Sequence, residues 1–387
     1  MFLQSRSCWL LLILIASVNS PLAAQTKNSE PLEKITITDT PPASLKGRFG
    51  ASKDSLLKNE GASAETEAGV VRGLAWLAKQ QKEDGHWEFD GSDKDQIAAT
   101  SLALLPFLGA GIPLGKEVIF KEYPPVVEKG IVWLCRQQTK NGDFKGTDRM
   151  ISHAMATIAL IECYGLTQDP KLKPYAMSAL DFIVKNQSKD GSWGQKVGAT
   201  GETMVVTWQI SALRAARTRE LKVEQGTFDK AKDFLISVST ESESRYRPSA
   251  KEEPTAQSTA AGLLCRVIMG MGSRNPSLAN GIKFLKETLP TEAKWDIEYY
   301  FFATEVFYTF GGPTWEEQWH PHIKWLLIKL QSREGDATGS WKKDKGKFGE
   351  LCGTLGTTSL AALTLEVYYR YPRFYKREKD ALDELEK

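Results

Sequence analysis

Apolar residues recur at helical spacing along most of the chain, in pairs of segments that alternate between two kinds of pattern. In the first segment of each pair, apolar positions alternate with Lys, Arg, Glu and Gln, which is typical of a helix with one face in solvent. The second segment is small and apolar nearly all round, which indicates a helix buried on every side. The sequence therefore predicts hairpins of one outer and one inner helix.

These hairpins repeat six times, about every 50 residues. The first helices are predicted in segments 73–81, 130–138, 179–187, 231–239, 281–289 and 322–330. The second helices are predicted in segments 98–111, 151–165, 204–217, 258–270, 298–312 and 357–369. Six such hairpins can close into a ring that needs no capping repeats. We therefore predict an all-α fold, an α/α toroid or (α/α)6 barrel, with a central cavity.

The turn inside a hairpin carries a recurring motif. Its members are Gln81, Gly85 and Trp87, then Gln138, Gly142 and Phe144, then Gln187, Gly191 and Trp193, and finally Gln331 and Trp341. A Gln at a helix end can hydrogen-bond the exposed carbonyls and the start of a neighbouring hairpin, the Gly supplies a tight turn, and the aromatic residue packs on the adjoining repeat. We interpret the motif as an outer-wall clasp and not as a catalytic loop.

Two of these stretches, RGLAWLAKQQKEDGHW at 72–87 and SALDFIVKNQSKDGSW at 178–193, resemble the Gln-Trp repeat of squalene-hopene and other triterpene cyclases. The resemblance covers roughly residues 66–370 and implies the α/α toroid that these enzymes share with protein prenyltransferases. The Asp-x-Asp-Asp motif with which such cyclases protonate an alkene is missing, and the chain has residues for one toroid where they carry two. Full cyclase activity is therefore not expected.

The sequence also lacks the residues for two other chemistries that occur on similar toroids. The zinc ligands of prenyltransferase β-subunits would correspond to Asp296, to Glu298 in place of a Cys, and to the neighbourhood of Gly356 in place of a His. The thioester of complement-like domains needs Cys-Gly-Glu-Gln, whereas Cys352 and Gly353 are followed by Thr and Leu. We expect no metal and no cofactor.

Polar residues at the starts of the inner helices form the candidate site. His153, Gln257 and Glu298 lie at equivalent positions, about 12 or 13 residues before the Gly that ends each helix, so they should meet at one mouth of the barrel. Asp296 and Glu298 are the candidate acids, because carboxyls beside aromatic rings can have raised pKa values. The candidate ligand-binding residues are His153, Gln257, Tyr299 and Tyr300. The alternative is that Asp296 only caps its helix and the aromatics are core.

The ends of the chain have a different character. Arg6, an apolar run from Cys8 to Val18 and small residues up to Ala24 predict a signal peptide over 1–24, although retention as a short anchor stays open. Residues 25–64 are rich in Ser, Thr, Pro, Lys and Glu, which predicts a polar linker. The toroid should span 65–372, and 373–387 should form a charged tail.

The remaining composition narrows the partners. A formal net charge of +2, with both signs interspersed, gives no electrostatic reason to expect nucleic acid. Four cysteines would remain after signal removal, and the sequence cannot pair them: Cys135, Cys163, Cys265 and Cys352.

Three functions remain open. The leading hypothesis is an exported, periplasmic or secreted toroid that binds an isoprenoid, another hydrophobic ligand or an envelope protein in or around its central cavity. One alternative is a terpenoid- or polyprenyl-processing enzyme with Asp296 or Glu298 as a non-standard acid. Another is a periplasmic polysaccharide hydrolase or lyase, which a glycan cleft lined by Trp315, Trp319 and Trp341 would support.

Overall fold

The computed structural model describes residues 32–36, 43–112 and 122–371. The predicted signal peptide and the charged tail over 373–387 lie outside the described residues. The chain divides into two units, and all described residues belong to the second, Leu32–Lys387. The description below concerns that second unit by itself.

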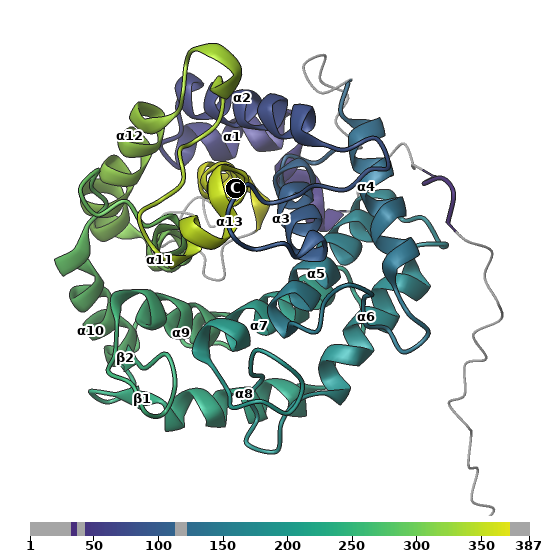
Figure 1. Ribbon diagram of the computed structural model, residues 1–387. Helices are drawn as coiled ribbons and strands as arrows, with labels where there is room; N and C mark the ends of the chain where they lie inside the picture. Colours follow the sequence, from purple (N-terminus) through teal and green to yellow (C-terminus); the bar gives the residue numbers. More distant parts are fainter. Residues whose placement is uncertain (1–31, 37–42, 113–121, 372–387) are drawn as a thin grey trace, which may run out of the picture. The chain divides into compact units, whose positions relative to one another are not determined.

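Six inner helices form a closed ring, in which each helix contacts the next and the last contacts the first (Figure 1). They are α3 (Gln96–Gly109), α5 (Met150–Thr167), α7 (Thr203–Thr218), α9 (Ala256–Ile268), α11 (Ile297–Phe310) and α13 (Lys347–Leu365). Nearly all of their residues are buried, as their apolar patterns predict. The predicted α/α toroid is confirmed.

An outer helix precedes each inner helix and packs against the outside of the ring. The outer helices are α2 (Ala64–Gln80), α4 (Pro124–Gln137), α6 (Lys173–Lys185), α8 (Gln225–Ser237), α10 (Pro276–Leu285) and α12 (His320–Leu330). Short elements lie between them: η3 (Lys286–Thr288), η4 (Thr314–Trp319), η5 (Gly335–Ala337), and the antiparallel strands β1 (Ser239–Thr240) and β2 (Arg245–Tyr246). By length and composition α5 could cross a membrane, but 89% of that stretch is buried in the ring.

The Gln residues of the repeated motif clasp neighbouring hairpins as predicted. The Gln81 Nε2 donates to the carbonyl of Gly85 in its own turn and to that of Val126 in the next outer helix, both at 2.9 Å. Gln138 bonds in the same way to the carbonyls of Gly142 and Tyr175. Gln187 bonds to those of Gly191 and Thr227. Gln331 bonds to Gly339 and to Gly69 of α2, so the last hairpin is clasped to the first.

The aromatic and Gly residues of the motif complete each clasp. The indole N–H groups of Trp87, Trp193 and Trp341 donate to carbonyls of their own outer helices at 2.8 to 2.9 Å. Gly85 has a φ of 105°, and a Cβ there would lie 2.5 Å from the carbonyl oxygen of Lys129. A side chain at this position would therefore push the two hairpins apart.

The sixth inner helix begins earlier than predicted. We expected it over 357–369, but α13 starts at Lys347 and is kinked at Gly353, where φ is 65°. The kink brings the helix against the first hairpin, where the Asp90 carboxylate accepts a hydrogen bond from the Leu355 N–H at 2.9 Å. A short α14 (Val367–Arg370) then ends the described chain.

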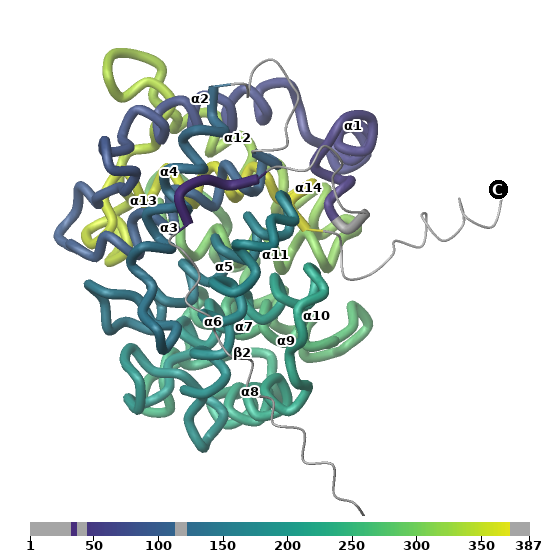
Figure 2. Tube along the Cα trace, turned by 90° about the vertical axis from the view of Figure 1, so that its right-hand side faces the viewer, coloured from purple at the N-terminus to yellow at the C-terminus, as the bar shows by residue number. Residues whose placement is uncertain are grey.

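The linker prediction is wrong for residues 43–59. They form η1 (Ala43–Arg48) and α1 (Gly50–Asn59), and Leu45 and Arg48 are buried against the toroid. In Figure 2, α1 and α14 lie side by side at one end of the ring, where they also contact each other. The segment carries too few apolar residues to show a helical period, because its anchors are single side chains such as Leu45 and Arg48.

Candidate functional site

The ring has two different ends. The inner helices all begin at one end, here called the N-terminal mouth, where the starts of α9 and α11 are joined through Gln257 and Glu298. They all finish at the other, the C-terminal mouth, where Glu162 of α5 and Arg219, which follows α7, are bonded. Because each helix carries partial positive charge at its start and partial negative charge at its end, the two mouths have opposite electrostatic character.

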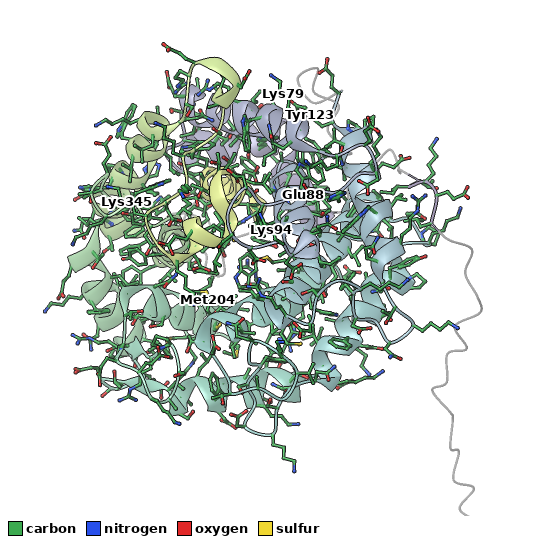
Figure 3. All side chains as sticks on the ribbon, viewed as in Figure 1. Lys79, Glu88, Lys94, Tyr123, Met204 and Lys345 are labelled. Atoms are coloured by element: carbon green, nitrogen blue, oxygen red, sulfur yellow. The ribbon has the colours of Figure 1, made fainter. Side chains whose placement is uncertain are left out.

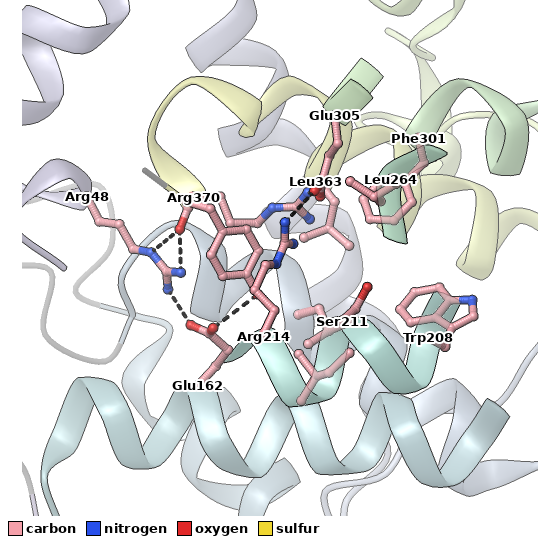
Figure 4. Close-up of a pocket in the computed structure, with 14 residues that line it drawn as sticks. Arg48, Glu162, Trp208, Ser211, Arg214, Leu264, Phe301, Glu305, Leu363 and Arg370 are labelled. Atoms are coloured by element: carbon pink, nitrogen blue, oxygen red, sulfur yellow. Dashed lines mark hydrogen bonds and ion pairs between the residues drawn. The ribbon is translucent and has the colours of Figure 1, made fainter. Parts of the chain in front are cut away.

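Side chains fill the C-terminal mouth. Glu162 is bonded to Arg48 at 2.9 Å and to Arg219 at 2.8 Å. Glu305 is bonded to Arg214 at 2.9 Å and also to Arg370. Figure 4 shows Arg48, Glu162, Arg214, Glu305 and Arg370 of this network beside a cavity whose other wall carries Trp208, Leu264 and Phe301.

The cavity beneath this network measures about 30 Å³, room for about two water molecules. Arg48 tightens the closure, because its guanidinium also donates to the carbonyls of Leu108 at 2.8 Å and Arg370 at 2.6 Å. Burial alone would raise the pKa of Glu162, but Arg219 and Arg48 hold it at about 2. The centre of the toroid is therefore closed by a network of ionised side chains.

The N-terminal mouth carries carboxyl groups instead. Glu298, 9% exposed, accepts a hydrogen bond from the Gln257 side-chain amide at 2.5 Å. Burial, with the nearby charges of Asp296 and Asp344, raises the pKa of Glu298 to about 8. Asp296 caps α11 by accepting the Tyr299 N–H at 3.0 Å, and burial raises its pKa as well. This arrangement keeps Glu298 protonated at neutral pH.

Asp344 is a member of this cluster that the sequence analysis missed. Its carboxylate accepts the N–H groups of Gly346 at 2.7 Å and Gly349 at 3.1 Å, and burial raises its pKa to about 6. The available signal was an Asp two residues before a Gly at a helix start, the pattern of an Asx turn. The cluster of Asp296, Glu298 and Asp344 is called the acid cluster below.

A groove follows the rim of the N-terminal mouth over the first three hairpins. One part, about 500 Å³, lies between the turns at 93–95 and 146–149. The other, about 280 Å³, shares Thr147, Asp148 and Arg149 and reaches Phe182 and Val197. We call the two parts together the rim groove. In Figure 3, Lys94 of this groove and Met204 at the start of α7 lie towards the middle of the ring.

Two ion pairs and an apolar patch line the rim groove. Arg149 pairs with Asp93, and Lys196 pairs with Asp148 at 2.5 Å. Val197 is 53% exposed beside the half-buried Phe182. The residues come from turns of three successive hairpins, so the toroid itself sets their spacing.

The structure separates the predicted ligand-binding residues. Gln257 reaches Glu298, but His153 is turned outward between the rings of Phe144 and Phe182, with centroids at 5.2 and 4.5 Å. The His153 Nε2–H donates to the Gly142 carbonyl at 3.1 Å, and burial lowers the pKa of His153 to about 4. His153 therefore does not join the acid cluster, but it lines the 280 Å³ part of the rim groove together with Phe144 and Phe182.

The two tyrosines also do not present free hydroxyl groups. The Tyr299 hydroxyl donates to the carbonyl of Leu285 at 3.1 Å, and the Tyr300 hydroxyl to that of Lys294 at 2.5 Å. Trp315, Trp319 and Trp341 are at most 1% exposed, so they do not line the expected glycan cleft.

Cys135, Cys163, Cys265 and Cys352 are all buried free thiols. Among the described residues, no group of three His, Cys, Asp or Glu side chains is placed to hold a metal ion.

Comparison with known proteins agrees with this architecture. Residues 144–310 match the squalene-hopene cyclase C-terminal domain family. No curated protein matches the sequence significantly. The apo type II terpene cyclase MstE from Scytonema superimposes with a TM-score of 0.54 at 11% identity, covering 79% of this chain and 98% of that one.

Two glycan-active proteins have the same fold. The GH76A α-1,6-mannanase from a Salegentibacter species superimposes with a TM-score of 0.57 at 11% identity, covering 79% of this chain and 98% of its own. A Clostridium perfringens α-amylase superimposes with a TM-score of 0.55 at 14% identity, covering 78% and 98%. At identities this low, the likeness shows the fold alone.

Proposed function

We propose that this chain, a terpenoid cyclase-like α/α toroid by its family match and its ring of helices, is an exported binding module that holds a segment of a partner protein in the rim groove. One observation carries the proposal. The cavity that the six inner helices line beneath the C-terminal mouth measures about 30 Å³, whereas the rim groove offers parts of about 500 and 280 Å³. A ligand larger than a few waters therefore has more room in the rim groove than in that cavity.

The lining of the rim groove favours a peptide over an isoprenoid. An isoprenoid chain needs a continuous apolar tunnel, because every buried CH₂ contributes about 0.8 kcal/mol. The rim groove instead combines an apolar patch at Val197 with the pairs Asp93–Arg149 and Asp148–Lys196. Peptides present apolar and charged groups at this kind of spacing, and protein interfaces use both.

Selection of peptides on the full-length chain tests the proposal. A phage-displayed library of linear peptides is panned on the immobilised protein, and selected peptides are measured by calorimetry. Val197→Asp should weaken rim-groove peptides at least about tenfold, because it buries a charge against the apolar patch. Ile236→Asp, at a 39% exposed site on α8, is the matched control and should leave affinity within about twofold. A set of binders indifferent to Val197→Asp would contradict the proposal.

A second candidate function is acid–base catalysis at the N-terminal mouth. The acid cluster favours it, because Glu298, with a pKa raised to about 8, lies near Asp344, whose pKa is raised to about 6. Environments that separate the pKa values of neighbouring carboxyls are how enzymes assign an acid and a base. Glu298 could then protonate a glycosidic oxygen or an alkene, with Asp344 or Asp296 as the base.

Turnover assays decide on this second function. The full-length chain is incubated with α-1,6-mannan, α-glucans, squalene and isoprenoid diphosphates. If Glu298 is the acid, product forms with one substrate and falls by about 100-fold or more in Glu298→Gln. Asp148→Asn, outside the acid cluster, should retain the rate. Absence of turnover with all of these substrates would remove the candidate.

A further inference from the structure

One outer helix displays a large aromatic side chain to solvent. Trp325 of α12 is 56% exposed, and it is the largest exposed hydrophobic residue in the described part of the chain. It lies in a groove of about 410 Å³ formed by Pro290 and Glu292 on one side and by Pro321, His322, Leu326 and Lys329 on the other. We call this the Trp325 groove. It lies on the outer wall, on the helix labelled α12 in Figure 1.

In the other hairpins, the preceding hairpin covers the equivalent aromatic. His86 stacks on Trp133 with centroids 5.3 Å apart, and His153 stacks on Phe182 at 4.5 Å. The Trp76 indole N–H donates to the Asp336 carbonyl at 3.2 Å. The backbone of Gly201 packs against Phe234, and the Arg245 guanidinium lies 4.5 Å from the centre of the Phe284 ring. Trp325 is the exception to this rule.

The fifth turn lacks the clasp of the repeated motif, as the fourth turn does, but the fourth turn still covers Phe284 through Arg245. Each clasping Gln bonds to the carbonyl seven residues before the covered aromatic, as Gln81 does to Val126 ahead of Trp133. The corresponding carbonyl ahead of Trp325 belongs to Gln318, where the His322 Nδ1–H donates to it at 2.5 Å. The turn of the fifth hairpin, residues 286–296 between α10 and α11, has no Gln to supply that bond and no Arg to lie over the ring. The ion pair that this turn does make with α12 joins Glu292 to Lys329 at 3.1 Å and leaves Trp325 exposed.

We infer that the Trp325 groove binds an extended peptide segment of a partner protein, which covers Trp325 as the preceding turns cover its equivalents. The covers already present are peptide turns that offer a carbonyl, an imidazole or a guanidinium to the ring. The Trp325 indole N–H donates to no acceptor in the described part of the chain, and Lys324 Nζ lies 5.3 Å from the ring centre. A peptide segment with a free carbonyl would accept the indole N–H, and a flat side chain on it would stack on the Trp325 ring.

The same peptide library tests this inference separately from the rim groove. A class of selected peptides should lose affinity at least about tenfold in Trp325→Ala and keep it in Val197→Asp. Ile236→Ala, a truncation to the same residue at another exposed site on an outer helix, should leave affinity within about twofold. Because Trp325 is largely in solvent, Trp325→Ala should unfold at nearly the same urea concentration as the parent chain, which shows that the variant is folded.

Three outcomes would overturn the inference. The first is a set of selected peptides none of which depends on Trp325. The second is Trp325-dependent binding of immobilised glycans without any such peptide. The third is a concentration-dependent dimer in sedimentation that Trp325→Ala abolishes, because the occupant would then be a second copy of the chain.

Discussion

The two mouths of the toroid carry partial charges of opposite sign from the helix ends, and different side chains gather at each. Six helix ends place partial negative charge at the C-terminal mouth, and Arg48, Arg214, Arg219 and Arg370 collect there. Six helix starts place partial positive charge at the N-terminal mouth, where Asp296 and Glu298 lie. The arginines are tied to Glu162 and Glu305, whereas the acids face one another. Ion pairs close the C-terminal mouth, whereas Glu298 at the N-terminal mouth is buried near two further carboxyls and makes no ion pair among the described residues.

The largest expected effect comes from breaking the C-terminal mouth. Glu162→Gln keeps the shape of the side chain but leaves Arg48 and Arg219 buried without their anion. Removing one partner of a buried pair costs about 3–5 kcal/mol, so the free energy of unfolding should fall by that amount at pH 7. Urea unfolding of the full-length chain, followed by circular dichroism, measures it.

The control breaks an ion pair at the other mouth. Asp148 and Lys196 have side chains that are 66% and 64% exposed, so Asp148→Asn should cost less than about 1 kcal/mol. If Glu162→Gln lowered the free energy of unfolding no more than Asp148→Asn does, the contrast between a closed C-terminal mouth and an open N-terminal mouth would be wrong.

A smaller effect should distinguish the mouths by pH. The pKa of Glu298 is raised from 4.5 to about 8 by burial, with Asp296 and Asp344 adding to it, so the folded state favours its protonated form. Its contribution to stability is complete below pH 4.5 and is lost as pH rises towards 8, by at most about 1.4 kcal/mol per pH unit. The contribution of Glu162 to stability has the opposite pH dependence, because its pKa is lowered in the folded state. This contribution is complete above pH 4.5 and is lost as pH falls towards 2.

Glu298→Gln should flatten only the alkaline side of that profile. The variant mimics the protonated acid, so its stability between pH 5 and 8 should change less than that of the parent chain, and the acid side should be unaltered. Urea unfolding at pH 5, 6, 7 and 8 provides the comparison. An equal slope in both proteins would mean that Glu298 does not carry the raised pKa.

The repeats made most of the fold predictable. The hairpins, the ring and the clasps by Gln81, Gln138 and Gln187 follow from a motif that recurs in register, and Gln257 and Glu298 follow from counting along the inner helices. The rest depends on contacts distant in sequence. Arg48 looked like linker because its partners are Glu162 and the Arg370 carbonyl, and Asp344 joins Glu298 only once the ring closes. His153 occupies an equivalent start position but turns outward, which spacing cannot reveal.

The clasp from Gln331 to Gly69 makes the junction between the last and first hairpins the same as any other. Arg48 and the Arg370 carbonyl meet at 2.6 Å, so the two ends of the described toroid are already adjacent. The ring therefore does not depend on which hairpin comes first in the sequence. A circular permutant joined between these ends and opened at the exposed Lys251 and Glu252 would keep every clasp and both mouths.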